Sequence, residues 1–273
     1  MPPRTQSEAL SVASRFHGSA LSLFKFDNIE VHGVITTLLL KTDEDNCFVG
    51  TYYRARANIE TMIGITDAKH FQALAMLARA IFELAVDIRL LSVIPDGPEK
   101  MVAGVDVEKL RCARKAAAFR AANAGAGVDS QFDLFIQFEA ARVDANRKRL
   151  WPHKDSTKLT NVTHWSGFEL RDRVTNLGAP FETIYNLRYP QLSWYVHSGL
   201  TGVVNVDVTA LTNVCTLSFK LAADAYWEVL KTIIVRYGIE KANEKIHQKM
   251  KVAQLLPFTD DPDQEDALVR SIQ

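Results

Sequence analysis

Apolar residues recur every three or four positions through most of this chain, the spacing that places them on one face of an α-helix. Residues 48–65 carry the pattern and form the first predicted helix of the central region. A longer helix is predicted to start at an N-cap, Thr66 or Asp67, and to stop at Pro95. The pattern therefore indicates helices separated by short connections.

Capping residues and helix breakers predict the next two boundaries. Asp106 is predicted to cap a helix that ends in a glycine-containing stretch. Asp129 or Ser130 then opens another helix, which Pro152 terminates. The segment 151–163 is either a loop between helices or a boundary between subdomains.

The signals for two later helices are strong. In 163–178, Ser166 and Glu169 have the spacing of a capping box, and Gly178 follows the last turn, so a short helix is predicted. The longest apolar pattern follows Asp207 and runs to Tyr237, long enough for the spine of the fold.

No segment shows sustained alternation of apolar and polar residues, so strands are at most minor. The predicted fold class is all-α, a multi-helix bundle with little or no sheet. Residues 1–47 are interpreted as an N-terminal helical extension, 48–238 as the bundle core, and 239–273 as a C-terminal helix with an acidic tail.

Composition narrows the class of protein without naming a partner. Apolar residues make up 47% of the chain, and 32 basic residues balance 32 acidic ones, so overall charge favours neither nucleic acid nor membrane. Cys47, Cys112 and Cys215 lie far apart without C-x-x-C spacing, which predicts reduced, buried thiols in a cytoplasmic protein. No stretch has the length of a membrane span, and the N-terminus has no basic segment followed by an apolar run, so no secretory signal is expected.

Two charges interrupt an otherwise apolar helix. Arg79 and Glu83 lie four residues apart within 71–86, where large apolar side chains occupy the other faces. Burial of charges requires partners, so the pair either forms a satisfied ion pair with Glu60 or Arg56 at a helix crossing or lines a functional pocket.

A second polar face is predicted in 186–200. With Pro190 at a first helical position, Ser193 and His197 share one side of a short helix, and His197 falls in the last turn, where proton transfer is favoured. The alternative is a histidine that only caps the helix. Arg188 and Tyr189 precede this face, and His164 begins a second segment with tryptophan and serine that could converge on it.

Local charge adds one further candidate function. Residues 100–120 hold six basic and two acidic residues, and residues 142–158 repeat that ratio with Trp151 and His153 among them. Basic residues interleaved with aromatic ones can bind a phosphate backbone and stack bases, although charged helix faces are commonly just solvated. The motifs of P-loop nucleotide hydrolases, zinc peptidases and esterases are absent from the sequence.

Three segments carry a family resemblance: LARAIFELAVDIRLL at 77–91, THWSGFELRDRVTNLG at 163–178 and YPQLSWYVHSG at 189–199. In that order they resemble a bacterial family of unknown function numbered five-six-seven-seven, across roughly residues 50–235. The last segment also resembles the terminal motif of HEPN domains. These are helical bundles, often dimers, and many of them cleave RNA without metal through an arginine and a histidine four to six residues apart.

The HEPN resemblance implies His197 as general acid or base and an arginine that holds the scissile phosphate. Arg188, however, stands nine residues before His197, so Arg79, Arg188 or an arginine of a partner chain would have to serve. The resemblance also implies RNA as substrate, a homodimer and no metal. The sequence itself gives no reason to expect a cofactor or a membrane partner.

Three hypotheses therefore remain open. The first is a metal-independent ribonuclease of toxin or defence biology, in which His197 transfers protons and Ser193 or Tyr189 orients RNA. The second is a non-catalytic bundle that binds a small polar or anionic ligand in a pocket of Arg79, Glu83, His164 and His197, with Glu60 and Tyr189 as further ligand-binding residues. The third is a structural or interaction module in which Arg79 and Glu83 set helix register.

Overall fold

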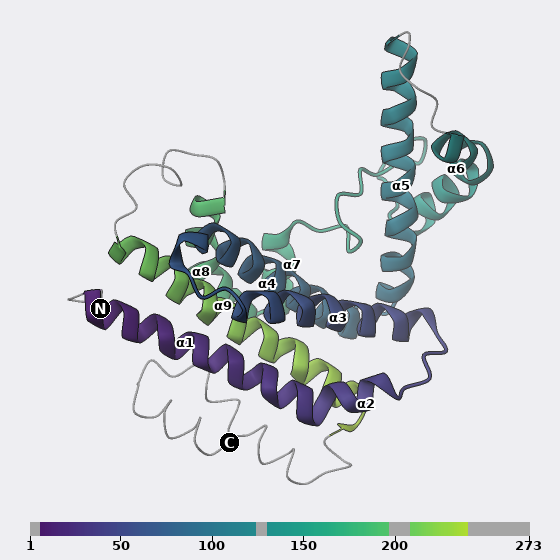
Figure 1. Ribbon diagram of the computed structural model, residues 1–273. Coiled ribbons are helices and arrows are strands. Elements are labelled where there is room, and N and C mark those ends of the chain that lie inside the picture. The colour runs from purple at the N-terminus through teal and green to yellow at the C-terminus, as the bar shows by residue number, and fades with distance from the viewer. Residues whose placement is uncertain (1–5, 124–129, 197–207, 240–273) are drawn as a thin grey trace.

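The computed structural model describes residues 6–123, 130–196 and 208–239, and within these ranges it contains helices and no strand (Figure 1). The all-α prediction is confirmed. The helices are α1 (Gln6–Phe26), a π-helical turn (Asp27–His32), α2 (Gly33–Thr36), α3 (Asp43–Ile63), a 3-10 turn (Ala68–His70), α4 (Phe71–Val93), α5 (Gly97–Ala122), α6 (Ser130–Leu150), α7 (Leu170–Leu177), α8 (Phe181–Val196) and α9 (Val208–Arg236).

The body of the molecule is built around α4 and α9, which contact each other most extensively, with α1, α3 and α8 alongside them (Figure 1). Tyr52 of α3, Phe82 of α4 and Trp227 of α9 are fully buried in one core, which Leu23 of α1 also enters. Each large apolar side chain buried in this way contributes about 1.5–3 kcal/mol to folding. This core fixes α4 and α8, the two helices that carry the predicted site.

Helices α5 and α6 form an antiparallel arm that projects away from the body (Figure 1). The arm has a small core of its own, which includes Leu110, Val143 and Trp151. Interhelical ion pairs lie along it, between Arg114 and Asp144 at 2.6 Å, Arg142 and Asp106 at 2.8 Å, Arg149 and Glu99 at 2.5 Å, and Arg120 and Asp133. The arm is therefore held by a narrow apolar seam and by paired charges on both sides of it.

Several predicted helix boundaries are correct and three are wrong. Gly178 ends α7 with a φ of +66°, and α9 lies within the predicted 207–237. Asp106 does not begin a helix, because α5 already starts at Gly97 with a proline in its first turn, which leaves the Asp106 carboxylate to bind Arg142 of α6.

The other two wrong boundaries concern Ser166 and Pro190. Ser166 does not cap α7, which begins at Leu170; its hydroxyl oxygen instead accepts a hydrogen bond from the Phe168 N–H in the preceding turn. Pro190 lies inside α8 and does not start it. The helix continues past this residue because Tyr185 and Tyr189 pack on the ring of Phe82, with centroids 6.4 and 5.4 Å away.

Residues 151–169 form the loop that returns the chain from the arm to the body. Trp151 donates its indole N–H to the Trp165 carbonyl at 2.9 Å, and the Thr160 hydroxyl donates to the Trp151 carbonyl at 2.7 Å. The first reading of 151–163, a loop between helices, is the one observed. Buried hydrogen bonds of this kind fix the orientation of the loop that carries His164.

Two of the three cysteines match their predicted environment. Cys47 and Cys215 are buried, and burial raises the pKa of each thiol to about 11, so both remain protonated and unreactive. Cys112 is exposed on α5, contrary to the expectation that all three thiols are buried. Among the described helices, none combines the length and the apolar character that a bilayer crossing requires.

Candidate functional site

Helix α4 carries a polar stripe formed by Arg79, Glu83 and Asp87. Their spacing of four places all three on one face of the helix, and Arg79 and Asp87 are about 12 Å apart along its axis. This face turns toward α8 at one end and toward α7 and its preceding loop at the other. The stripe therefore meets two separate sets of partners.

At the first end, the Tyr189 hydroxyl joins Arg79 to Glu83. The phenol donates to Glu83 Oε1 at 2.5 Å and accepts from Arg79 Nη2 at 2.9 Å. The Arg79 guanidinium also lies over the Tyr189 ring, 4.7 Å from its centroid, and its buried Nε has no hydrogen-bond partner among the described residues. Burial, and next the hydrogen bond to Glu83, raise the pKa of Tyr189 to about 12, so the phenol is a proton donor at neutral pH and not a base.

At the other end, Asp87 binds His164 and Arg173. Arg173 Nη1 donates to Asp87 Oδ1 at 2.6 Å, and His164 Nε2 lies 3.1 Å from the same carboxylate oxygen. The other imidazole nitrogen is 2.8 Å from the Ser166 hydroxyl oxygen. The contacts anchor the loop 151–169 to α4.

The order of Ser166, His164 and Asp87 matches that of a nucleophile, a base and an orienting carboxylate. Ser166, however, is buried, and its oxygen already accepts from the Phe168 N–H in the turn. The group therefore holds the loop and lacks an exposed nucleophile. His164 is brought to the same helix face as Arg79, but its partners are Asp87 and Arg173.

The remaining predicted site residues lie in different surroundings. Arg188 forms an ion pair with the buried carboxylate of Asp224 on α9, so it is not free to hold a phosphate. The Ser193 hydroxyl donates to the Tyr189 carbonyl at 3.2 Å within α8. Glu60 is exposed on α3, and Arg79 and Glu83 meet through Tyr189 in place of the expected contact with Glu60 or Arg56. His197 lies outside the described residues, as do Ser198 and the acidic tail.

A second charged cluster was not predicted from the sequence. Asp27 is fully buried and accepts hydrogen bonds from Tyr52 at 2.6 Å and Tyr226 at 2.7 Å, while Arg56 forms an ion pair with it. Burial raises the pKa of both phenols, and the Asp27 carboxylate adds to that shift. The signal available in the sequence was Arg56 itself, which was considered only as a possible partner of Arg79 and Glu83. All the groups are paired, so this cluster serves the fold.

The two basic segments meet on the arm. Segment 100–120 lies on α5, and segment 142–158 begins on α6 and continues into the loop, so the antiparallel pairing places them side by side. Several cations are paired with carboxylates across the arm, as described above. Others form no close ion pair with a carboxylate in the part of the chain that the structure describes: Lys109, Lys115, Arg147, Lys148 and Lys154. The hydrogen bond from Arg111 lowers the pKa of Glu108, and Lys115 helps to lower it.

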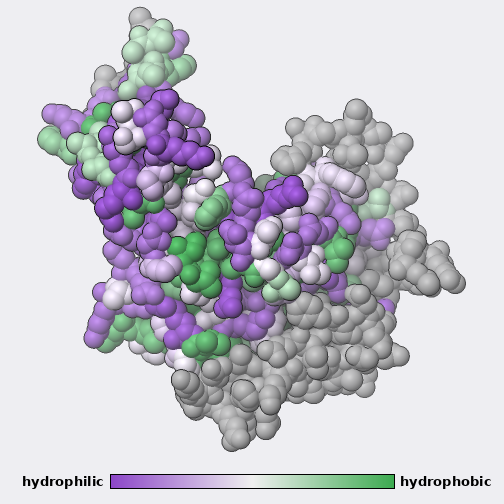
Figure 2. Space-filling model, turned by 180° about the vertical axis from the view of Figure 1, so that it is seen from behind, coloured by the Kyte–Doolittle hydropathy of each residue, from purple (hydrophilic) through white to green (hydrophobic). Residues whose placement is uncertain are grey.

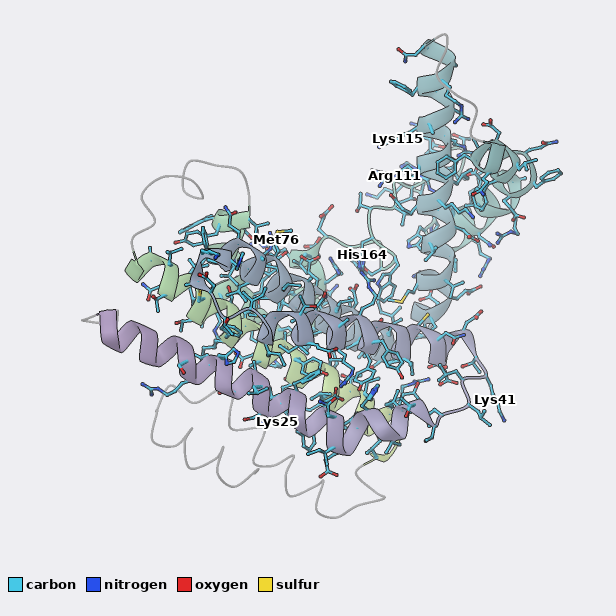
Figure 3. The ribbon with its side chains drawn as sticks, viewed as in Figure 1. Lys25, Lys41, Met76, Arg111, Lys115 and His164 are labelled. Atoms are coloured by element: carbon cyan, nitrogen blue, oxygen red, sulfur yellow. The ribbon has the colours of Figure 1, made fainter. Side chains whose placement is uncertain are left out.

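A groove of about 330 Å³ runs between α5 and α6, with Val107 and Val143 among its apolar lining residues. Its charged lining residues are four cations and one carboxylate: Arg111, Arg114, Lys115, Arg147 and Asp144. Figure 3 shows Arg111 and Lys115 along α5, above His164 at the foot of the arm. Such a groove offers guanidinium and ammonium groups to an anion and apolar surface to a flat ring.

Exposed aromatic rings stand near the tip of the arm. Phe119 of α5 is 63% exposed and Phe138 of α6 is 69% exposed. Figure 2 shows the arm as a mainly hydrophilic surface with hydrophobic residues toward its tip. The same two helices thus carry exposed rings and cations without close ion pairs, and single-stranded nucleic acids bind surfaces that combine the two.

Comparison of the chain with protein-family models, with curated proteins and with solved structures finds no match. The function is therefore argued from this chain's own residues.

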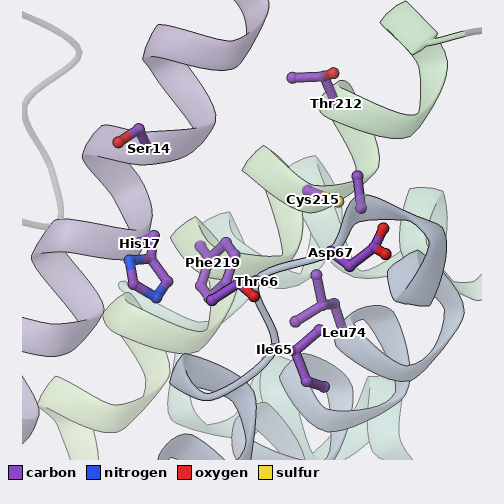
Figure 4. A pocket seen from close by; sticks show the side chains of 10 residues that line it. Ser14, His17, Ile65, Thr66, Asp67, Leu74, Thr212, Cys215 and Phe219 are labelled. Atoms are coloured by element: carbon purple, nitrogen blue, oxygen red, sulfur yellow. The ribbon is translucent and has the colours of Figure 1, made fainter.

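Another cavity, of about 260 Å³, opens between α1, the start of α4 and α9 (Figure 4). His17 and Phe219 meet edge to face at its wall, and Leu74 and Cys215 contribute apolar surface. His17 Nε2 is 2.9 Å from the Ile63 carbonyl oxygen, so that nitrogen is already engaged. None of the predicted site residues that the structure describes lines this cavity. Across residues 6–123, 130–196 and 208–239, no three histidine, cysteine, aspartate or glutamate side chains group so that they could hold a metal ion.

Proposed function

We propose that this protein binds single-stranded RNA along the α5–α6 arm. The observation that carries the proposal is the convergence of two distant basic segments on one projecting hairpin. Arm residues 97–122 and 130–163 hold twelve basic and seven acidic side chains, while the whole chain is neutral. The positive charge is therefore concentrated on the arm.

The arrangement of paired and unpaired charges supports RNA as the ligand. The interhelical ion pairs join the two helices of the arm, whereas Lys115 and Lys148 are exposed and form no close ion pair among the described residues. Phosphate groups would pair with such cations and release their counterions, which makes binding salt-dependent. Phe119 and Phe138 offer faces on which bases can stack, and stacking favours single strands over duplex.

The binding test measures fluorescence anisotropy of a labelled single-stranded RNA at several salt concentrations. We expect the double variant Lys115→Ala/Lys148→Ala to bind more weakly and to lower the slope of log K against log salt by about 1.4, because each lost phosphate contact contributes about 0.7 for single strands. The matched control, Lys25→Ala/Lys41→Ala, removes the same charge from exposed positions on the body (Figure 3). Equal losses in both double variants, or no binding by the wild type, would contradict the proposal.

A second, more specific activity is metal-independent cleavage of the bound RNA, and the Arg79 environment favours it. Arg188 is held by Asp224, which leaves Arg79 as the predicted arginine that can hold the scissile phosphate. Tyr189 is a proton donor, and His164 is held by Asp87 and Arg173. The remaining imidazole among the predicted residues is His197, four positions after Ser193 in the sequence.

In the proposed reaction, His197 accepts the proton of a ribose 2′-hydroxyl, whose oxygen attacks the neighbouring phosphorus. The bond from phosphorus to the 5′-oxygen breaks, and this oxygen takes up a proton from water as it leaves. The products are a 2′,3′-cyclic phosphate and a 5′-hydroxyl end. Arg79 stabilises the negative charge that builds on the phosphoryl oxygens.

The cleavage test follows labelled RNA in EDTA on a gel. We expect the wild type to cleave, His197→Ala to lower the rate by about 10²–10⁴-fold, and an RNA with a 2′-deoxy residue at the cleaved position to resist. His70→Ala, at an exposed position near the start of α4, serves as control and should cleave like the wild type. If the wild type binds RNA but leaves it intact in EDTA, the cleavage proposal is wrong and the binding proposal stands.

A further inference from the structure

A cavity of about 530 Å³ lies between α4, α9 and the connection from α7 to α8, elements that pack together in the body (Figure 1). Its volume falls within the range of small-molecule sites in proteins, about 300–1,000 Å³. It shares no lining residue with the groove of the arm or with the Arg79 site.

The charges that line this cavity are predominantly positive. Arg89 is exposed, and the described part of the chain provides no carboxylate partner for it. Lys231 pairs with Glu228 at 2.5 Å, and Arg236 pairs with Glu44 at 3.0 Å. Arg89 is therefore the cation of the wall whose charge an incoming anion would neutralise most effectively.

The hydroxyl groups of the wall define what else the ligand must carry. Ser92 donates its hydroxyl proton to the Ile88 carbonyl at 3.2 Å, and Thr232 donates to the Glu228 carbonyl at 2.9 Å. With these protons engaged, the two hydroxyl oxygens can only accept hydrogen bonds from a ligand. The Glu228 side chain is likewise an acceptor. A complementary ligand therefore combines an anionic group with its own hydroxyl donors.

The remaining wall is apolar and closes one side of the cavity. Leu177, Pro180, Phe181 and Val235 line it. Bare inorganic anions would leave this surface and the hydroxyl acceptors without contacts. An organic anion of several carbon atoms would cover both.

We propose that this cavity binds a small hydroxylated organic anion, with its acidic group on Arg89 and its hydroxyl groups donating to Ser92, Thr232 and Glu228. The acidic group is a phosphate or a carboxylate, both of which a guanidinium binds through paired hydrogen bonds. The proposal is independent of RNA binding, because the cavity lies in the body and its residues take no part in the arm.

The test measures the thermal unfolding midpoint of the full chain against increasing ribose 5-phosphate and, separately, gluconate. A ligand that binds the folded state raises the unfolding midpoint progressively. Whichever of the two compounds raises it identifies the acidic group as a phosphate or a carboxylate. Ribose should give no shift, because it has hydroxyl groups but no acidic group for Arg89. Inorganic phosphate should give a smaller shift, because it has the acidic group but does not reach the hydroxyl acceptors.

Two variants and a control locate the site. Arg89→Gln should weaken binding about ten- to a hundredfold, the usual loss for a charge-assisted hydrogen bond. Thr232→Val keeps the side-chain volume but removes the hydroxyl oxygen. It should weaken binding of the hydroxylated anion and leave binding of inorganic phosphate unchanged. Arg54→Gln, an exposed arginine on α3, should bind like the wild type. If neither hydroxylated anion shifts the midpoint, or if Arg89→Gln and Arg54→Gln behave alike, the proposal is wrong; RNA binding by the arm would remain as measured.

Discussion

Replacing Asp27 with alanine should lower the free energy of unfolding by about 3–5 kcal/mol, because it leaves a charged partner in the core without its counterion. Asp27 has no exposed surface, and the Arg56 side chain that pairs with it is only 12% exposed. The hydroxyl groups of Tyr52 and Tyr226 would also lose their acceptor. One substitution therefore removes three interactions that join the π-helical turn to α3 and α9.

Urea unfolding followed by circular dichroism measures this loss. Asp106→Ala provides the contrast, because it removes an ion pair with Arg142 on the surface of the arm, where such pairs contribute about 0.2–1 kcal/mol. Asp27→Asn removes the charge but keeps one acceptor oxygen, which can serve only one of the two tyrosines because they donate to different carboxylate oxygens. Its stability should therefore lie between those of the wild type and Asp27→Ala. If Asp27→Ala cost no more than Asp106→Ala, the carboxylate would not be part of the stabilising core.

The sequence predicted the helices well where packing and local signals agree. In α9 the apolar pattern continues to the end of the helix, and Gly238, with a positive φ, follows its last turn. Around Pro190 the local rule failed, because the rings at 181, 185 and 189 all reach Phe82 and keep α8 helical through the proline. A boundary that depends on contacts with another helix is not encoded in the residues beside it.

For the candidate site, too, the sequence indicated some of the residues but not their partners. Arg79 and Glu83 could be selected from the sequence, because charges in an apolar helix require partners. Their actual partner, Tyr189, lies 106 residues beyond Glu83, and only the packing of α8 on α4 brings it there. The Asp27 cluster was missed for the same reason: Tyr226 is 199 residues away, and a single aspartate near the N-terminus carries no local sign of burial.

In the arm, a count of charges does not show whether the two basic segments form one surface. Two basic segments with the same ratio of charges can be solvated faces of separate helices or one continuous surface. The antiparallel pairing of α5 and α6 joins them and neutralises many of the cations with carboxylates across the seam. Cations without an ion pair remain at fewer positions, and the RNA-binding experiment changes two of them, Lys115 and Lys148.

A further large loss of stability is expected on replacing Arg188, which the HEPN resemblance made a candidate for binding the scissile phosphate. Arg188→Met removes the guanidinium that pairs with Asp224, a carboxylate with no exposed side-chain surface, and should destabilise the fold by about 3–5 kcal/mol. In the double variant Arg188→Met/Asp224→Leu neither charge remains, so much of the stability should return. Urea unfolding of both single variants and the double variant gives the coupling energy of the pair.

The same double variant separates folding from function. Because Arg188 lies against α9 and not at the arm, a folded Arg188→Met/Asp224→Leu protein should retain RNA binding with an unchanged salt slope, and cleavage if the wild type has it. Circular dichroism confirms that the protein is folded before RNA is added. If a stable double variant lost cleavage while Arg79→Lys kept it, the phosphate would be held by Arg188, and the buried ion pair with Asp224 would have to open when RNA binds.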